Sequence, residues 1–269
     1  MERSLVFKCL PPQSLPPNWG GLCEIEPHVF EEQVPLMLPR NGMLLALWMV
    51  WIAAGVVRGA EPTSSQPQPD KPTQDSVVWK FDNLQKIGGH KLTVVGDPQV
   101  IQVQGAQAIE FDGEDDAIFF DVHPLAGWQD FTAEVVFRPD GDGPFAQRFF
   151  HMQQRESEDR LLFETRVRDG KWYLDTYIHS GPGNYTQMDQ KFLHPADRWH
   201  HAALVVEGNQ MRHYVNGKLE IKTDVKFQPF GPGQTSVGVR INKVHWFKGA
   251  VREARFTPRP LEPKDFLKP

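Results

Sequence analysis

The chain has 269 residues, 40% of them hydrophobic, and a net charge of −5, so it can bury one sizeable core. This mild acidity leaves no basic footprint for nucleic acid or an anionic membrane, and we expect neither as a partner. The two cysteines, Cys9 and Cys23, both lie near the N-terminus, so we expect the rest of the chain to be held by core burial alone.

Residues 37–60 have the pattern of a secretory signal peptide. Arg40 stands in a short positive lead, and Leu44–Val57 is an apolar run that small residues follow. The run is shorter than the roughly 20 residues that span a bilayer, so a retained membrane anchor is the less favoured alternative. We expect cleavage after Gly59 or Ala60, no membrane insertion afterwards, and a periplasmic, cell-surface or extracellular location.

The segments on either side of this signal have no sign of a fold. Residues 1–36 are proline-rich and aperiodic, which we interpret as an extension upstream of the true start, with Met37 or Met43 as alternatives to Met1. Residues 61–76 contain four prolines and no aliphatic or aromatic side chain, which predicts a disordered linker. Without residues 1–60 the chain loses five acidic and four basic residues, and its net charge becomes −4.

Residues 77–269 read as one all-β domain. Short runs of alternating apolar residues are separated by clusters of Gly, Pro, Asp and Asn, which is typical of a two-sheet antiparallel sandwich or jelly roll. The expected strands are Val77–Phe81, Lys91–Val95, Val100–Val103, Ala108–Phe111, Ala117–Val122, Phe131–Arg138, Gln147–Gln153, Leu161–Arg168, Lys171–His179, Gln234–Ile241 and Ala250–Thr257, together with the hairpin described next.

The strongest local signal is the hairpin within residues 198–222. Asn216-Gly217 is the dipeptide that best accepts the positive φ angles of a type I′ turn. This turn would place Tyr214 opposite Leu219 and Arg212 opposite Ile221.

Two strands can be divided into faces. Phe131, Ala133, Val135 and Phe137 should point to the core, while Thr132, Glu134, Val136 and Arg138 should form a partly wet face. In the later strand, Trp172, Leu174, Thr176 and Ile178 oppose Tyr173, Asp175, Tyr177 and His179. The second set combines aromatic rings with hydrogen-bonding groups, so we expect it to suit a ligand best.

Several motifs, in their order, resemble the concanavalin A-like lectin/glucanase superfamily, and specifically laminin-G-like jelly-roll domains of exported bacterial proteins. The residues that carry the resemblance are Phe111, Asp112, Gly113, Asp116, Trp199, His201, Tyr214, Asn216, Gly217 and Gly249. The resemblance implies a sandwich whose concave sheet and rim loops often hold the ligand. It implies no single activity, because its members include lectins, adhesion modules, hydrolases and lyases.

The acidic stretches offer two kinds of chemistry. Glu110, Asp112 and Glu114 have the E-x-D-x-E spacing that glucanases of the superfamily use, but Gly113 interrupts the strand, so we expect Asp112 and Asp116 to bind backbone amides of a tight turn. Calcium is the one cofactor these loops could hold, although a solvated turn is the favoured interpretation. The candidate calcium ligands are Asp112, Glu114, Asp115, Asp116, Asp140 and Asp142.

The histidines do not predict a metal site. His200 and His201 are adjacent in a strand and must point to opposite faces, and we expect one of them to bond a backbone carbonyl. His151, His179 and His213 lie on separate strands, so a zinc site is disfavoured. No P-loop, nucleophile elbow or dinucleotide motif is present.

Aromatic and amide side chains are the better indication of function. Sugar rings stack on exposed aromatic faces while amides and carboxylates bond their hydroxyls. The expected binding residues are Tyr173, Tyr177, His179, Asn184, Tyr185, Gln187 and Trp246, with Ser180–Gln190 as a rim loop. We therefore predict a non-catalytic carbohydrate-binding or adhesion-type module.

Two alternatives remain open. The first is a polysaccharide hydrolase or lyase, with Tyr177, His179, Arg166 and Glu164 as the first suspects. The second is a domain that binds a cell-envelope protein.

Overall fold

A computed structural model describes residues 75–103 and 105–269. The predictions made for residues 1–74, which include the upstream extension, the signal peptide and most of the linker, lie outside the described residues. Among the described residues, no helix is long and apolar enough to cross a membrane.

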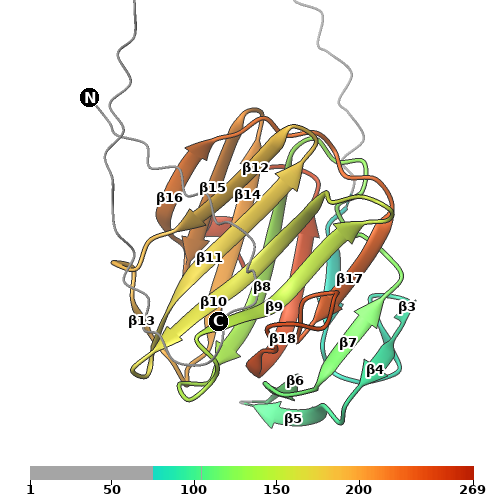
Figure 1. Cartoon of the computed structure of the whole chain (residues 1–269), viewed down its shortest axis with the longest axis vertical. Coiled ribbons are helices and arrows are strands. Elements are labelled where there is room, and N and C mark those ends of the chain that lie inside the picture. Colours follow the sequence, from blue (N-terminus) through green and yellow to red (C-terminus); the bar gives the residue numbers. More distant parts are fainter. Residues whose placement is uncertain (1–74, 104) are drawn as a thin grey trace, which may run out of the picture. The chain divides into compact units, whose positions relative to one another are not determined.

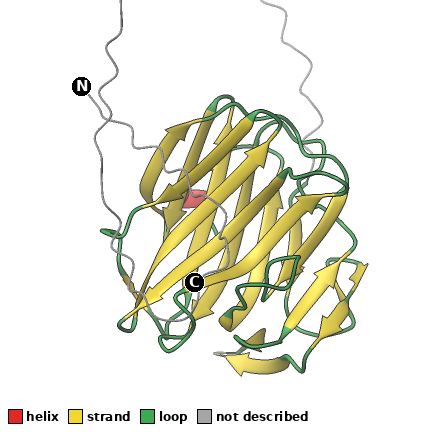
Figure 2. Ribbon diagram, viewed as in Figure 1, coloured by secondary structure: helices red, strands yellow, loops and turns green. Residues whose placement is uncertain are grey.

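The domain is a sandwich of two antiparallel sheets, as predicted (Figures 1 and 2). The first sheet has the order β16 (Lys218–Asp224), β15 (Gln210–Val215), β14 (His200–Glu207), β8 (Phe131–Pro139), β18 (Lys248–Thr257), β6 (Ala106–Asp112) and β5 (Gln99–Val103), with β1 (Val77–Lys80) paired to β18. The second has the order β12 (Gly183–Met188), β11 (Lys171–Ser180), β10 (Arg160–Arg168), β9 (Ala146–Gln154), β17 (Gly233–Val237), β7 (Ala117–Phe120) and β4 (Thr93–Val95), with β13 (His194–Pro195) paired to β11. A small hairpin, β2 (Lys86–Ile87) with β3 (His90–Lys91), and the 3-10 turn η1 (Pro263–Asp265) complete the described part.

Aromatic side chains fill the space between the sheets. Phe137 of β8 and Phe149 of β9 stack with their ring centroids 4.0 Å apart, and Trp172 of β11 meets Phe137 edge-on at 5.1 Å. Trp79 and Phe120 form a second stack at 4.5 Å. Each fully buried ring contributes roughly 1.5–3 kcal/mol, so the core is stabilised by burial without any cysteine in the described residues.

The inward-facing side chains of β11 follow the predicted alternation. Trp172, Leu174, Thr176 and Ile178 of β11 all point into the core and are at most 1% exposed. His200 bonds the carbonyl oxygen of Pro195 at 2.8 Å, as expected for one of the two adjacent histidines.

We predicted that the second face of β8 is partly exposed to water, and this was wrong, because the face is almost fully buried. Thr132, Glu134 and Val136 have no exposed area, because the C-terminal segment lies across them. The amide of Leu261 donates to Thr132 Oγ1 at 2.9 Å, and the amide of Leu267 donates to Glu134 Oε1 at 2.8 Å. Local alternation could not reveal a cover supplied from more than 100 residues away.

The central hairpin confirms the turn but corrects part of the register. Asn216 and Gly217 have φ angles of 51° and 78°, and Tyr214 lies opposite Leu219. Arg212, however, lies opposite Lys222 and not Ile221. The register shifts at His213/Tyr214, since a β-bulge adds one residue there.

Two other predictions were wrong about where strands end. Ser180–Gln190 is not a rim loop, because its residues 183–188 form β12 and extend the second sheet beside β11. The expected strand Gln234–Ile241 ends at Val237, because Gly238 has a φ of 90° and the chain leaves the sheet.

Glu134 fastens the C-terminal segment to β8. Its carboxylate meets His201 Nε2 at 3.0 Å, Arg255 Nε at 2.6 Å and the amide of Leu267. Burial by itself raises the pKa of Glu134, but these hydrogen bonds outweigh it and lower the pKa below the usual value.

We predict that Glu134→Gln lowers the free energy of unfolding at pH 7 by roughly 3 kcal/mol, because it leaves a buried ion pair without its acid. The pKa of Glu134 is lower in the folded state than in the unfolded state. The extra stability of wild type over the variant should therefore be complete above the pKa of the unfolded state. It should vanish as the pH falls through the pKa of the folded state. Urea titrations from pH 7 to pH 3 measure this. Glu253→Gln on β18 is the control, and equal losses in both variants would contradict the prediction.

Candidate ligand-binding face

The candidate site is the side of the second sheet that points away from the core, here called the outer face. On β11 the inward direction of Trp172 and Leu174 forces Tyr173, Asp175, Tyr177 and His179 outward. The strand register then aligns the neighbours of these residues in transverse rows. The rows are Ala146–Arg166–Tyr173, Arg148–Glu164–Asp175–Met188, His151–Leu162–Tyr177–Thr186 and Gln153–Arg160–His179–Asn184.

Four of the seven predicted binding residues share this face. Tyr173 is 9% exposed, Tyr177 and His179 are half-buried, and Asn184 is exposed beside His179. The structure therefore brings this part of the predicted platform together.

The other three predicted residues lie elsewhere. Gln187 is 1% exposed and turns inward, where its Nε2 donates to the carbonyl of Met211 at 2.9 Å. Tyr185 packs against the core, and its hydroxyl accepts the amide of Lys226 at 2.6 Å. Trp246 is half-buried in the segment between β17 and β18. Because residues 183–188 form the strand β12, alternate residues must face opposite sides, and Tyr185 and Gln187 take the side away from Asn184.

One row of the outer face is a chain of ion pairs. Glu164 Oε2 lies 2.9 Å from Arg148 Nη2 and 3.0 Å from Arg166 Nη1, and Arg166 Nη2 reaches Asp175 Oδ2. The Glu164 and Asp175 side chains are 6% and 3% exposed, so the two carboxylates are nearly closed to solvent. Burial raises the pKa of Asp175 to about 7, and the charge of Glu164 directly opposite adds to this rise, while Arg166 and Arg148 oppose it.

Asp175→Asn should change the pH dependence of stability. The pKa of Asp175 is higher in the folded state than in the unfolded state, so the protonated carboxyl stabilises the fold at low pH. This stabilisation is lost as the pH rises through about 7. The variant lacks this loss, so its stability relative to wild type should increase from pH 5.5 to pH 8.5. Thermal melts across that range measure the difference. Asp169→Asn in the exposed β10–β11 turn is the control, and a constant difference would refute the assignment.

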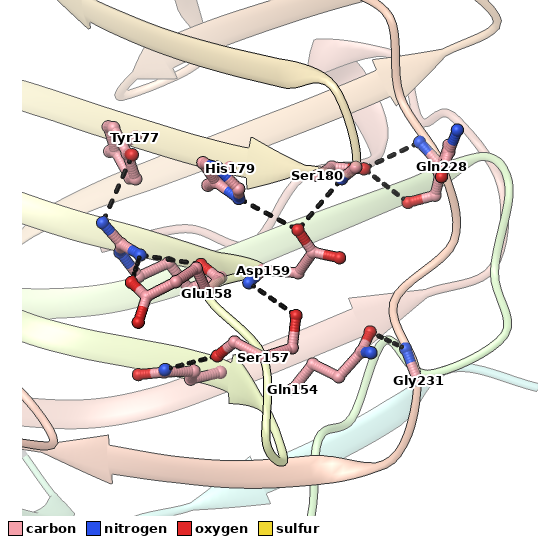
Figure 3. A network of polar contacts seen from close by, with 12 residues as sticks. Gln154, Ser157, Glu158, Asp159, Tyr177, His179, Ser180, Gln228 and Gly231 are labelled. Carbon is pink, nitrogen blue, oxygen red and sulfur yellow. Dashed lines mark hydrogen bonds and ion pairs between the residues drawn. The ribbon is translucent and has the colours of Figure 1, made fainter.

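A second polar network closes the far end of the outer face (Figure 3). Asp159 Oδ1 accepts from the Gly181 amide and lies 2.9 Å from His179 Nδ1. The Arg160 guanidinium lies 4.9 Å from the ring centroid of Tyr177 and bonds Glu158 at 2.8 Å. Tyr177 and His179 are thus held in place by Arg160 and Asp159.

The opposite end of the outer face is hollowed. A depression of about 440 Å³ is lined by Phe145, Arg168, Asp169, Lys171, Tyr173, Gln190 and Leu193. The Phe145 ring is 55% exposed and Leu193 is 50% exposed, although both are large apolar side chains. The sequence interpretation missed Phe145. The available signal was an aromatic residue directly after the Gly- and Asp-rich turn 140–144.

The acidic turn after β6 has the structural role that was expected. Asp112 Oδ1 accepts the amides of Glu114, Asp115 and Asp116, at 2.8 to 3.2 Å. Asp116 accepts the amides of Asp97 and Asp112. Burial raises the pKa of Asp116, whereas in Asp112 the backbone hydrogen bonds outweigh burial and lower it.

Calcium would have limited free oxygens here. Among the described residues, Asp112, Asp115 and Asp116 form the one group of acidic or histidine side chains whose ligand atoms lie within 4.8 Å of one another. Asp140 is paired with Arg138 at 3.1 Å, and Asp142 with Lys248 at 2.6 Å. The group fits a calcium ion only in part, since three of its six carboxylate oxygens already accept backbone amides.

The suspected catalytic residues separate into two places. Glu164 and Arg166 belong to the buried ion pairs, while Tyr177 and His179 belong to the network of Figure 3. Glu110 is ion-paired to Arg138 at 2.6 Å on the first sheet, and Asp112 is occupied by the turn. Carboxylates do face one hollow of about 470 Å³ beside this turn, but Glu110 and Asp140 are paired with Arg138 there. The acidic residues that line it are Asp97, Glu110, Asp112, Asp115, Asp116 and Asp140.

The remaining family motif residues are structural. Phe111 lies in the core, and Trp199 lies 5.4 Å from the guanidinium of Arg252. Gly249 has a φ of 145°, and a side chain there would meet the carbonyl oxygen of Arg138 at 2.2 Å.

The comparisons with known proteins agree with this architecture. A laminin-G-like family model described as the concanavalin A-like lectin/glucanases superfamily matches residues 112–265. The chain therefore belongs to this superfamily, as its motifs predicted. None of the curated protein sequences matches it.

Solved structures share the fold at low sequence identity. Domain 4 of AbnA, an extracellular GH43 arabinanase from Geobacillus stearothermophilus solved with arabinotriose, is 17% identical, with a TM-score of 0.54 over 70% of this chain and 94% of that one. The binding domain of botulinum neurotoxin serotype D is 9% identical, with a TM-score of 0.52 over 70% of this chain and 49% of that one. The chain thus spans about half the length of the neurotoxin domain.

Proposed function

We propose that this protein is an exported, non-catalytic carbohydrate-binding module that holds a glycan on the outer face. The observation that carries the proposal is Phe145, a ring 55% exposed in a hollow that Tyr173 also lines. Exposed aromatic faces bind sugar rings by stacking, and Lys171 and Gln190 supply hydrogen bonds at the rim.

Other features of the outer face support binding rather than catalysis. Its two central carboxylates are buried in ion pairs, so a substrate could not reach them without breaking those pairs. The arabinanase domain solved with arabinotriose is a similar fold with a sugar ligand. The neurotoxin domain has a similar fold and is also a binding domain. A protein of the cell envelope therefore remains the alternative partner.

Phe145→Ala should weaken glycan binding by about tenfold, which corresponds to about 1.4 kcal/mol. Because the ring is more than half exposed, the variant should melt within a few degrees of wild type. A glycan array identifies the bound oligosaccharide, and calorimetry with that oligosaccharide measures the loss.

Leu219→Ala is the matched control, since Leu219 is 44% exposed on the first sheet, away from the hollow. An array without binding at high protein concentration would contradict the proposal. Capture of a defined envelope protein that Phe145→Ala abolishes would then favour the protein partner.

Export rests on the sequence of residues 37–60. We predict that a bacterial host expressing the full reading frame releases a product that begins at Glu61 or Ala60. Amino-terminal sequencing of the released protein checks this. A product that retains residues before Met37 would show that translation starts at Met1 and that the signal interpretation is wrong.

A further inference from the structure

The turn between β10 and β11 places two cations directly opposite each other in the hollow. Asp169 and Gly170 have φ angles of 53° and 68°, the left-handed values of a two-residue type I′ turn. Arg168 and Lys171 flank this turn and are cross-strand partners, and both side chains are exposed and line the hollow of about 440 Å³. Like charges in this position repel each other. A negatively charged ligand in the hollow would relieve the repulsion.

The acids around the hollow leave this pair of cations largely uncompensated. Asp169 lies 3.4 Å from Arg168 Nε, but the two side chains are 88% and 75% exposed, and an ion pair so open to water contributes little. Asp189, at the start of the segment that closes the hollow, is paired with Lys191 at 2.7 Å. Among the residues that the structure describes, Lys171 has no ion-pair partner.

The next charges along the outer face do not change this balance. The row beside the hairpin adds a third cation, Arg166, opposite Tyr173. Glu164 and Asp175 follow one row further, but their side chains are only 6% and 3% exposed and are held by Arg148 and Arg166. A ligand in the hollow therefore meets a local excess of positive charge, although the whole chain has a net charge of −5.

The hollow also sets an apolar surface beside the cations. The amide of Val167 donates to the carbonyl oxygen of Phe145 at 2.8 Å, which holds Phe145 beside the end of β10 that carries Arg168. Tyr173 and Leu193 line the same hollow. A guanidinium presents a planar fork that fits a carboxylate or a sulfate, and an ammonium group binds either one as a point charge. The lining thus suits a ligand that has both an apolar ring face and an acidic group.

We propose that the glycan bound in the hollow is acidic, with a carboxylate or sulfate group between Arg168 and Lys171 and its sugar ring against Phe145. An ionised oxyanion accepts hydrogen bonds and donates none, which matches two side chains that only donate. The inference rests on the proposed function and deepens it, because it names the chemical class of the ligand as a uronate or a sulfated sugar.

The test uses the full chain and two pairs of glycans that differ in their anionic groups. Oligogalacturonate is compared with its methyl ester, and dextran sulfate with dextran, by isothermal titration calorimetry at low and high sodium chloride. At least one charged glycan should bind about tenfold more tightly than its neutral counterpart, a difference of about 1.4 kcal/mol. The preference should shrink as the salt concentration rises, because salt screens exposed charges.

Single substitutions assign the preference to the two cations. Arg168→Gln and Lys171→Gln should each remove most of the preference and leave binding of the neutral glycan unchanged. Neither variant should melt below wild type, because each removes the repulsion between the cations. Lys222→Gln is the matched control, since Lys222 is exposed on β16 of the first sheet and its loss changes the net charge equally.

The outcomes separate this inference from the proposed function. A preference for oligogalacturonate or for dextran sulfate that both substitutions remove supports the inference and identifies the acidic group. Equal binding of charged and neutral glycans, binding of none of the four, or an equal loss of preference in Lys222→Gln overturns it. A neutral oligosaccharide that binds through Phe145, with the same affinity in the Arg168→Gln and Lys171→Gln variants, would also overturn it but would leave the proposed function standing.

Discussion

The packing of aromatic side chains between the two sheets is the constraint on which the rest of the molecule depends. Phe137, Phe149 and Trp172 must face inward to bury their rings, and the two-residue period of a strand then dictates which side chains face outward. Tyr173, Tyr177 and His179 reach the outer face because Trp172, Leu174 and Ile178 occupy the core. The composition of the proposed binding face is thus a consequence of how the core is filled.

The side chains on the outward sides of the two sheets have different surroundings. On the first sheet the C-terminal segment lies across β8, and a buried glutamate, Glu134, secures it. On the outward side of the second sheet, nearly buried ion pairs such as Arg166–Asp175 join β10 to β11. A buried ion pair contributes little net stability compared with apolar packing, so these pairs add less to the stability of the fold than the aromatic core does.

The outer face has three chemically distinct parts in succession. Phe145 and Tyr173 lie in the hollow, a row of ion pairs that includes Arg148 forms the middle, and the network around Asp159 forms a polar end. From Tyr173 to His179 the strand advances six residues, roughly 20 Å. For the proposed glycan ligand, this length corresponds to several sugar units and not to a single sugar.

The sequence alone determined the sandwich class, the Asn216-Gly217 turn and the division of β11 into two faces, because strand alternation and turn chemistry are local properties. Tertiary structure decided the rest. The pairing of residues 183–188 with β11 turned Tyr185 and Gln187 inward, and the return of the C-terminal segment buried Glu134. Phe145 and Arg148 acquired their surroundings from strands and segments up to about 100 residues away, and contacts between residues so distant leave no periodic trace in the sequence.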